Sequence, residues 1–404
     1  MTFSFDQLRL VGLFTILFAA NTIPLAILSK KRQSHNDIRI MLLFVGVYLI
    51  HVAGLFNSEN FDQGTFELEK KLAMLIFPMA IYFSPRMEWR KIKNVLLSFA
   101  GSCVIVMIVC FLVAVYRWYD KSDILYFFYH TLSETVGMHA SYLSMYCCFS
   151  IAILLFLTHR EGNFGQSRKH KVLIIIAIMI LILGVLLLSA RMQLLILFLG
   201  LILYAFVRLV RKYGLAKSLI GSMLIGLIAI FITLLFPLNR ERFKQVINYR
   251  NEYSISSKWG EQQFRVLIWS CAYEIIKSKP IAGVGTGDGE DMLQDCYLKN
   301  EYGSLTYFPN SRFNAHNQFL ETAIQLGIGG LLILILSTII PLYRAWRQEN
   351  VFYVVFILIF MLSCMTESML ESQSGIIYFA FFNSFLFMNE ISGRSQEGEL
   401  NSAI

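Results

Sequence analysis

Charged side chains are scarce in this sequence: only 15% of its 404 residues are charged, whereas 56% are hydrophobic. The mean hydropathy of +0.58 is far above what a soluble domain of this length hides from water. This shortage of charge excludes a water-soluble enzyme and indicates a polytopic membrane protein. The net charge of +8 comes from 35 Lys and Arg against 27 Asp and Glu, and the excess lies in short loops between apolar runs. That distribution indicates membrane orientation and gives no support to nucleic-acid binding.

Cysteine pairs with metal-binding spacing are also missing. The seven cysteines include no Cys-x-x-Cys motif, and five of them lie in apolar stretches. The pattern implies no metal site and no disulfide scaffold, although it leaves open whether Cys271 and Cys296 pair. A cleavable signal peptide is lacking too. The first apolar run, 10–28, contains Asn21 and Pro24 and ends at three basic residues, so we expect it to be retained as a span.

Long apolar runs are what the sequence has in abundance. A helix needs about 20 residues to cross about 30 Å of hydrocarbon, where lipid offers the backbone no hydrogen-bond partner. Eleven runs approach this length, and we therefore expect an all-α polytopic membrane protein with about 11 transmembrane helices. The runs are 10–28, 38–56, 70–84, 95–116, 137–158, 172–189, 192–209, 216–236, 319–340, 351–368 and 374–389. The shortest are 70–84 and 374–389.

The loops between these runs alternate in charge along the whole chain. Lys and Arg mark cytoplasmic loops of membrane proteins. The basic loops are 29–37, 85–94, 159–171, 208–217 and 341–350, and the acidic or mixed loops are 57–69, 117–136, 237–318 and 369–373. This alternation predicts that the N-terminus and the 237–318 segment lie outside and the C-terminal tail lies in the cytoplasm. We expect one transmembrane domain, 1–404, with 237–318 as its large external loop.

The apolar run 172–207 is too long to be a single span. As one helix it would extend about 54 Å at 1.5 Å per residue. We expect a turn near 189–191, which puts Arg191 at the outer face. An arginine at the membrane edge suits a phosphate or diphosphate, which its guanidinium holds by bidentate hydrogen bonds. The alternative is an interfacial arginine that extends to lipid headgroups.

The external segment 237–318 has enough pattern to fold. Apolar residues recur at helical spacing from Gln262 to Ile276, which predicts an amphipathic helix on the membrane or against the bundle. Pro280 ends this helix, and the glycine-rich turn 283–287 follows. The turn lacks the Gly-Lys-Ser/Thr ending of a nucleotide-binding loop. We expect it to bring backbone close to a ligand or a helix.

Several charged residues of this segment have ordinary explanations. Arg265 follows Glu261 by four residues, which predicts a surface ion pair worth about 0.3 to 0.5 kcal/mol. The acidic residues Asp288, Glu290 and Asp291 lack the spacing of a calcium loop. We expect them to form a solvated face.

His316 is a candidate general base. It lies in Asn-Ala-His-Asn-Gln, 314–318, at the outer start of a predicted span. An imidazole there can accept a proton from a hydroxyl, and such help is worth about 10² to 10⁴ in rate. The alternative is an interfacial histidine that completes a helix start.

Other residues lie at the outer ends of predicted spans or in the external segment. His139, Tyr142, Asn317 and Gly285 are candidates to line one cavity with Arg191 and His316. For His139 and Tyr142 a packed helix start is the alternative. Glu367 and Glu371 bracket a short outer turn. Solvated loop carboxylates are the usual explanation for such a pair, and a proton relay is the alternative.

Three separated segments together resemble the O-antigen ligase and polymerase superfamily of bacterial envelope glycosyltransferases. They are 188–191 (Leu-Ser-Ala-Arg), 265–287 from Arg265 through the glycine turn, and 315–330 from Ala-His-Asn-Gln to Gly-Ile-Gly-Gly. The order and spacing of arginine, glycine turn and His-Asn carry the resemblance. The long external loop in the second half of the chain extends it over essentially the whole sequence. The chain departs from the family in having Ser-Ala-Arg for Ser-Arg and eleven spans for about twelve.

The resemblance implies a GT-C-type glycosyltransferase of the bacterial inner membrane. Such an enzyme takes a glycan from undecaprenyl diphosphate and joins it to a sugar hydroxyl of a glycan or lipid acceptor, with inversion and without metal or other cofactor. By matching positions, Arg191 and Arg265 would hold the diphosphate, and His316 would act as base or orient the acceptor. Fixed arginines in a partly dehydrated cavity can neutralise the leaving group in place of a metal ion. Besides donor and acceptor, only membrane lipids are implied as partners.

Three functions stay open at this point. A ligase attaches a finished polysaccharide to lipid A core or a similar acceptor, whereas a polymerase joins repeat units that remain on the lipid carrier. The two share donor chemistry, so they differ in the acceptor that the cavity admits. A transporter or flippase of lipid-linked sugars also needs cationic groups inside its bundle, but the repeated halves of many transporters are not evident in this sequence.

Overall fold

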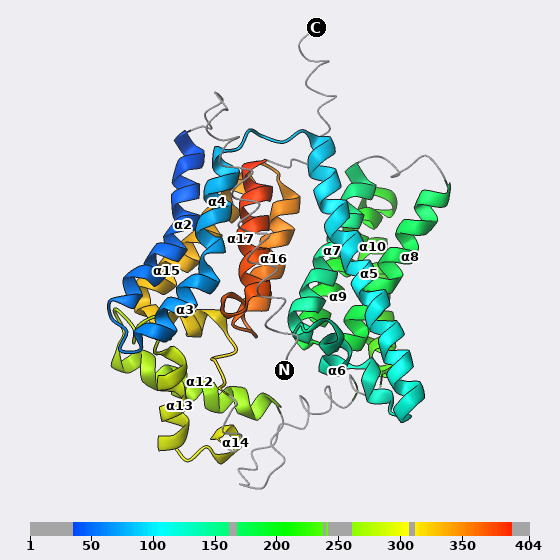
Figure 1. Ribbon diagram of the computed structural model, residues 1–404. Helices are drawn as coiled ribbons and strands as arrows, with labels where there is room; N and C mark the ends of the chain where they lie inside the picture. The colour runs from blue at the N-terminus through cyan, green and yellow to red at the C-terminus, as the bar shows by residue number, and fades with distance from the viewer. Residues whose placement is uncertain (1–34, 161–167, 237–239, 241–260, 307–311, 390–404) are drawn as a thin grey trace. The chain divides into compact units, whose positions relative to one another are not determined.

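The computed structural model describes residues 35–160, 168–236, 240, 261–306 and 312–389, and every regular element within them is a helix (Figure 1). Seven helices of this part are long and apolar enough to cross a membrane. They are α2 (His35–Leu55), α5 (Trp89–Lys121), α7 (Ala140–Arg160), α8 (Arg168–Leu188), α9 (Arg191–Tyr213), α10 (Leu215–Leu235) and α15 (Gln318–Arg347). The all-α polytopic membrane architecture is thus confirmed. The predicted span 10–28 lies outside the described residues.

The remaining predicted spans correspond to helices shorter than these seven. The last two are the apolar helices α16 (Val351–Cys364) and α17 (Gln373–Met388). The run 70–84 is not one helix, because it is divided between α3 (Phe61–Lys71) and α4 (Ala73–Phe83). The α3 helix is rich in charge, and α4 has 11 residues, which is about 16 Å of helix.

The turn expected within the run 172–207 is present. Helix α8 ends at Leu188, and α9 begins at Arg191. Ser189 has φ 52°, in the left-handed region, and its hydroxyl bonds to carbonyls of the last turn of α8 at 3.1 and 3.2 Å. The Ser189 hydroxyl thus supplies a hydrogen-bond donor to carbonyls that have no helical partner at the end of α8. A left-handed residue after a helix end is usually glycine.

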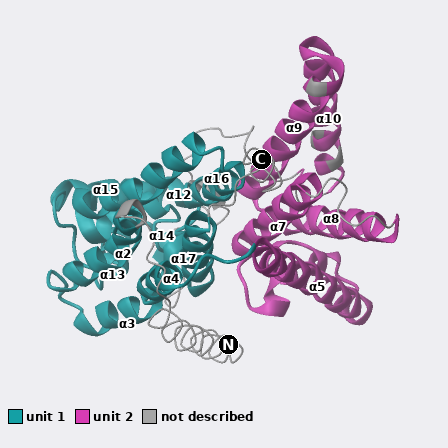
Figure 2. Ribbon diagram, turned by 90° about the horizontal axis from the view of Figure 1, so that it is seen from above, with its two compact units in different colours: residues 1–88, 255–404 teal, residues 89–254 magenta. Residues whose placement is uncertain are grey.

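The chain divides into two compact units, coloured separately in Figure 2. Unit 1 consists of 1–88 and 255–404, and unit 2 of 89–254. In unit 1, α17 packs against α4, and α15 packs against α2 and α16. In unit 2, α7 packs against α5 and α8, and α9 packs against α10.

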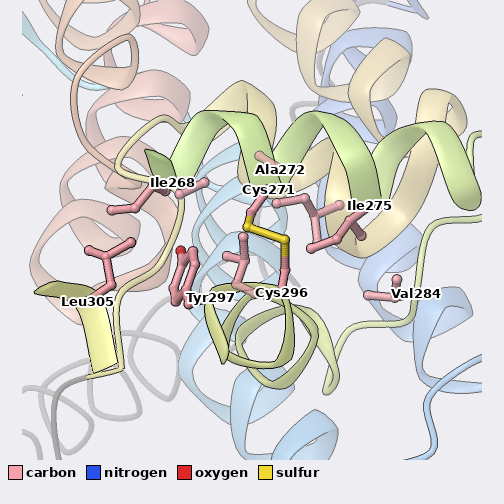
Figure 3. Packing of buried hydrophobic residues seen from close by; sticks show 11 residues of the cluster. Ile268, Cys271, Ala272, Ile275, Val284, Cys296, Tyr297 and Leu305 are labelled. Carbon is pink, nitrogen blue, oxygen red and sulfur yellow. A yellow bond between two sulfur atoms is a disulfide. The ribbon is translucent and has the colours of Figure 1, made fainter. Parts of the chain in front are cut away.

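The described part of the external segment folds, as predicted. Helices α12 (Glu261–Ser278), α13 (Gly289–Lys299) and α14 (Gly303–Thr306) lie together at one end of the helices of unit 1 (Figure 1). The predicted amphipathic helix is α12, which buries one face in a core with α13 and α14. At the centre of this core a disulfide joins Cys271 to Cys296, among residues such as Ile275 and Tyr297 (Figure 3). The sequence left this pairing open, because it depends on α12 and α13 lying side by side.

The glycine-rich turn lies against helix α15, where α15 is kinked. Gly327 has φ 61° and ψ −159°, which interrupts the helical ladder of α15. The carbonyls of Ile324 and Gln325 accept hydrogen bonds from Val284 and Gly285, both at 2.9 Å. The kink therefore supplies acceptors to the turn, and the turn satisfies carbonyls that the kink exposes.

The other side of the turn lies against the end of α2. Gly285 has φ 116°, and a Cβ there would lie 2.5 Å from the Ser58 hydroxyl oxygen. The Thr286 hydroxyl donates to the His51 carbonyl at 2.7 Å. The prediction that this turn brings backbone close to a helix is confirmed. The close contact with Ser58 explains why position 285 is a glycine.

The solvated face predicted for the acidic cluster is wrong. Asp288 is only 8% exposed, and its two carboxylate oxygens accept the backbone N–H groups of Glu59 and Asn60, both at 2.8 Å. Asp291 forms an ion pair with Arg312 at 2.7 Å. These two N–H groups lie between α2 and α3 and have no partner within a helix, so the Asp288 carboxylate supplies the acceptors that they need.

Candidate functional site

Two of the predicted site residues meet at a single carboxylate in unit 1. The guanidinium of Arg265, on α12, lies 3.0 Å from Glu367 Oε1. Nδ1 of His316, just before α15, lies 3.1 Å from Glu367 Oε2. Arg265 therefore pairs with a residue 102 positions later in the sequence. The side chain of Glu261, its predicted partner, lies outside the described residues. Glu367 was predicted to be a solvated loop carboxylate, and that prediction is wrong because Glu367 is largely buried and pairs with both residues.

The three side chains differ in their access to solvent. The Glu367 side chain is 9% exposed, whereas those of Arg265 and His316 are 22% and 26% exposed. The carboxylate is thus largely buried beneath two groups that still reach the surface. Hydrogen bonds with an ionised partner are stronger than neutral ones, more so where water is excluded.

The backbone at His316 is strained. Its φ of 44° lies in the left-handed region, which costs a residue other than glycine of order 1–3 kcal/mol. Neighbouring groups hold this conformation: Asn314 Oδ1 accepts the His316 N–H at 3.0 Å, and Glu321 accepts the Ala315 N–H at 2.7 Å. The Trp269 indole donates to the Ala315 carbonyl at 3.0 Å. Three side chains thus hold the strained backbone conformation in place, which is typical of functional sites.

The residue after His316 begins helix α15. Asn317 Oδ1 accepts the backbone N–H groups of Phe319 and Leu320 at 3.0 and 3.2 Å, which is the usual N-cap arrangement. Its amide also donates to the carbonyl of Met365 at 3.1 Å. Asn317 therefore connects the start of α15 to the turn that carries Glu367.

Three further predicted site residues, Arg191, His139 and Tyr142, belong to unit 2. Arg191 is half-buried at the first position of α9. The ring of His139 lies 4.1 Å from that of His130 and 6.1 Å from that of Tyr142, and Tyr142 is buried at the start of α7. The convergence of Arg191 with Arg265 and His316 on one cavity stays a prediction.

Comparison with known families tests the resemblance. Residues 176–335 match the family model for O-antigen ligase. This match supports the resemblance of the chain to the O-antigen ligase superfamily. The matched segment runs from α8 into α15 and includes Arg191, Arg265 and His316. A search of curated proteins finds no match to this chain.

The match to the O-antigen ligase family model supports part of what the resemblance implied. A multi-pass membrane protein with ligase-like or polymerase-like glycosyltransferase function in lipopolysaccharide biosynthesis agrees with the family and with the apolar helices. Its partners are, in general terms, a lipid-linked glycan and an acceptor. Glu367 lies beyond the matched residues. The sequence signal that could have pointed to it is a carboxylate in an external turn on the same predicted side as His316.

Proposed function

We propose that this protein transfers a glycan from undecaprenyl diphosphate to a sugar hydroxyl at the outer face of the bacterial inner membrane. The observation that carries this proposal is the junction of His316 and Arg265 at the buried carboxylate of Glu367. One group that can accept a proton and one that can bind a phosphate are thereby held next to each other.

His316 is the base of the proposed reaction. With the Glu367 carboxylate as acceptor, the imidazole carries its hydrogen on Nδ1, and Nε2 has the lone pair that faces the acceptor hydroxyl. Nε2 takes the hydroxyl proton as the oxygen bonds to the anomeric carbon, and Glu367 stabilises the imidazolium that forms. The same division of roles operates in Ser-His-Asp hydrolases.

The arginines serve the leaving group. As the new bond forms on one side of the anomeric carbon, the bond to the diphosphate oxygen breaks on the other, so configuration is inverted. The electron pair stays on the diphosphate, and guanidinium groups of Arg265 and Arg191 neutralise the added charge without a metal ion. Glu367 orients Arg265 through one bond and leaves other guanidinium N–H groups for phosphate oxygens.

The proposed orientation has support from the disulfide. Disulfides form and persist in oxidising compartments outside the cytoplasm. The bond between Cys271 and Cys296 joins α12 to α13, and α12 carries Arg265. This favours an external site, in agreement with the alternation of basic loops, which also predicts an external N-terminus and a cytoplasmic C-terminus.

An assay of the purified protein tests the proposal. With undecaprenyl-diphosphate glycan and a defined sugar acceptor, we expect wild type to release the carrier diphosphate and both His316→Ala and Arg265→Ala to lose that activity. Arg312→Ala is the matched control, because Arg312 belongs to the same segment but pairs with Asp291. Wild-type protein that moves the lipid across vesicle membranes without releasing diphosphate would contradict the proposal and favour a transporter.

The acceptor distinguishes ligase from polymerase. We propose the ligase, which attaches a finished polysaccharide to lipid A core or a similar acceptor. A deletion strain should then lose all attached polymer. Retention of a single attached repeat unit would instead identify a polymerase that joins lipid-linked repeats.

A further inference from the structure

A fully buried lysine lies behind the turn that carries Glu367. Lys71, the last residue of α3, has a side chain that is 0% exposed and binds Glu67 at 2.9 Å and Glu371 at 2.8 Å. Lys70 binds Glu67 at 2.6 Å and donates to the Glu371 carbonyl at 3.3 Å. Two ammonium groups and two carboxylates thus form a buried cluster with no net charge. The prediction of a solvated Glu371 is wrong, because this carboxylate is the partner of Lys71.

Stability alone is a weak explanation for this cluster. Buried ion pairs often stabilise no more than apolar side chains of similar volume would, because desolvation opposes the attraction. The cluster is also not fully satisfied, since Glu371 Oε1 is buried with no hydrogen-bond partner among the described residues. A specific geometric role explains better why a lysine is buried here.

The cluster holds one end of a short turn, 365–371. Glu371 ends the turn, which includes the 3₁₀ helix η3 (Met369–Glu371), and Lys71 fastens it to α3. At the other side, Gln318 accepts the Leu370 N–H, next to the bond from Asn317 to the same turn. Glu367 lies between these attachments. The turn is therefore held between α3 and the start of α15, where His316 is located.

On the basis of the proposed function, we infer that Lys71 is a positioning residue for glycan transfer. By holding Glu371 it fixes the turn that places Glu367 against His316 and Arg265. Among the described residues Lys71 pairs with Glu67 and Glu371, and it acts on His316 and Arg265 through the turn. A displacement of about 1 Å in a catalytic group lowers a rate by about 100-fold, so a loosened turn has a large effect on turnover.

Lys71 carries a positive charge in the folded protein. Burial by itself would lower the pKa of Lys71, but the carboxylates of Glu371 and Glu67 overcome that effect and raise it. The ammonium group is therefore present at every pH at which the enzyme is assayed, and its bonds to both carboxylates are charge-assisted.

The test compares variants of the full-length protein in the carrier-diphosphate release assay. We expect Lys71→Met to lower kcat by about 10- to 100-fold with a change of less than about 3-fold in the KM of the donor, because catalytic alignment and not donor contact is altered. Lys71→Arg, which keeps the charge, should recover part of kcat. Lys299→Met is the matched control, because Lys299 pairs at the surface with Glu274, and it should retain wild-type turnover.

A second variant covers the case in which Lys71→Met does not fold. The pair Lys71→Met with Glu371→Gln removes one charge of each sign, and Lys70 still neutralises Glu67. We expect this variant to fold, with the same loss of kcat. Folded variants with wild-type kcat would overturn the inference.

A double-mutant cycle separates positioning from general stability. If Lys71 acts through Glu367, then the substitution at Lys71 should cost less than about 3-fold in kcat when Glu367→Gln is already present. Losses that multiply independently would show that Lys71 does not act through Glu367. If wild type itself releases no diphosphate, the proposed function fails, and the role in transfer fails with it. If wild type is active but the effects of the Lys71 and Glu367 substitutions on kcat multiply independently, the positioning role of Lys71 is overturned and the proposed function is not.

Discussion

His316 Nδ1 lies 3.1 Å from Oε2 of Glu367, a residue 51 positions later in the chain. The same carboxylate lies 3.0 Å from the guanidinium of Arg265, so one buried group orients both an imidazole and a guanidinium. Arg265 and His316, both recognisable from the sequence, are thereby linked through a third residue that lies outside the matched family segment.

Replacement of Glu367 by glutamine tests this link. Glu367→Gln keeps the size of the side chain but removes the charge that stabilises an imidazolium, so we expect kcat to fall by about 10² to 10⁴. Carrier-diphosphate release under single-turnover conditions measures the effect. Glu59→Gln is a suitable control, since Glu59 is exposed and its backbone N–H and carbonyl form its hydrogen bonds to Asp288 and Phe61. Unchanged turnover in Glu367→Gln would remove the carboxylate from the mechanism.

Arginine and lysine should not be equivalent at position 265. Arg265→Lys keeps the positive charge but loses the planar fork that can bind Glu367 and a phosphate oxygen at the same time. We expect kcat/KM for the lipid-linked donor to fall by about 10-fold or more. Steady-state kinetics at several donor concentrations measure this change. Full activity with lysine would show that a point charge suffices.

The glycine turn should tolerate no side chain at position 285. Gly285→Ala places a Cβ 2.5 Å from the Ser58 hydroxyl and forces alanine to φ 116°, so we expect a loss of about 2–3 kcal/mol in stability. Thermal unfolding in detergent measures it. At Gly303 a Cβ meets nothing within 4 Å, and Gly303→Ala should unfold within a degree or two of wild type. Equal midpoints for both variants would contradict the packing described for the turn.

The disulfide should stabilise helices α12 and α13. Cys271 and Cys296 are 25 positions apart, and closing a loop of that length in the unfolded chain is worth about 3 kcal/mol. We expect the double variant Cys271→Ser, Cys296→Ser to unfold at a lower temperature. Added reductant should lower the wild-type midpoint and leave the variant unchanged. A wild-type protein that labels with a thiol reagent at both positions without prior reduction would refute the pairing.

The acid stability of the protein should depend on Glu67. Burial raises the pKa of this carboxyl, but the ion pairs with Lys71 and Lys70 prevail and lower the pKa from 4.5 to about 2. A carboxyl with a depressed pKa stabilises the fold fully above its unfolded pKa, and the contribution is lost as the pH falls through the folded value. We expect a loss of about 3 kcal/mol between about pH 4.5 and pH 2.

Unfolding midpoints measured across that range test the expectation. Glu67→Gln has no carboxyl to titrate and should show a flatter profile there. Glu371 does not mask the effect, because burial raises the pKa of Glu371 and moves its titration above this window. A wild-type profile as flat as that of Glu67→Gln would contradict the assignment.

The sequence by itself determined the membrane architecture. Apolar runs of sufficient length must become helices in lipid, so α2, α5, α7 and α15 followed from hydropathy, and the turn at Ser189 followed from length alone. The glycine turn and the family were likewise recognisable, because they depend on local conformation and on short motifs. The same local signals identified Arg265 and His316.

Only the tertiary structure decided which groups these residues meet. Glu261 was the nearest charge to Arg265 in sequence, whereas Glu367 is its partner in the fold. Charged residues in a loop look solvated until neighbouring helices cover them, which is why Asp288 and Glu371 were misjudged. Burial and pairing arise from contacts between residues that are 51 to 300 positions apart, and no local pattern encodes those contacts.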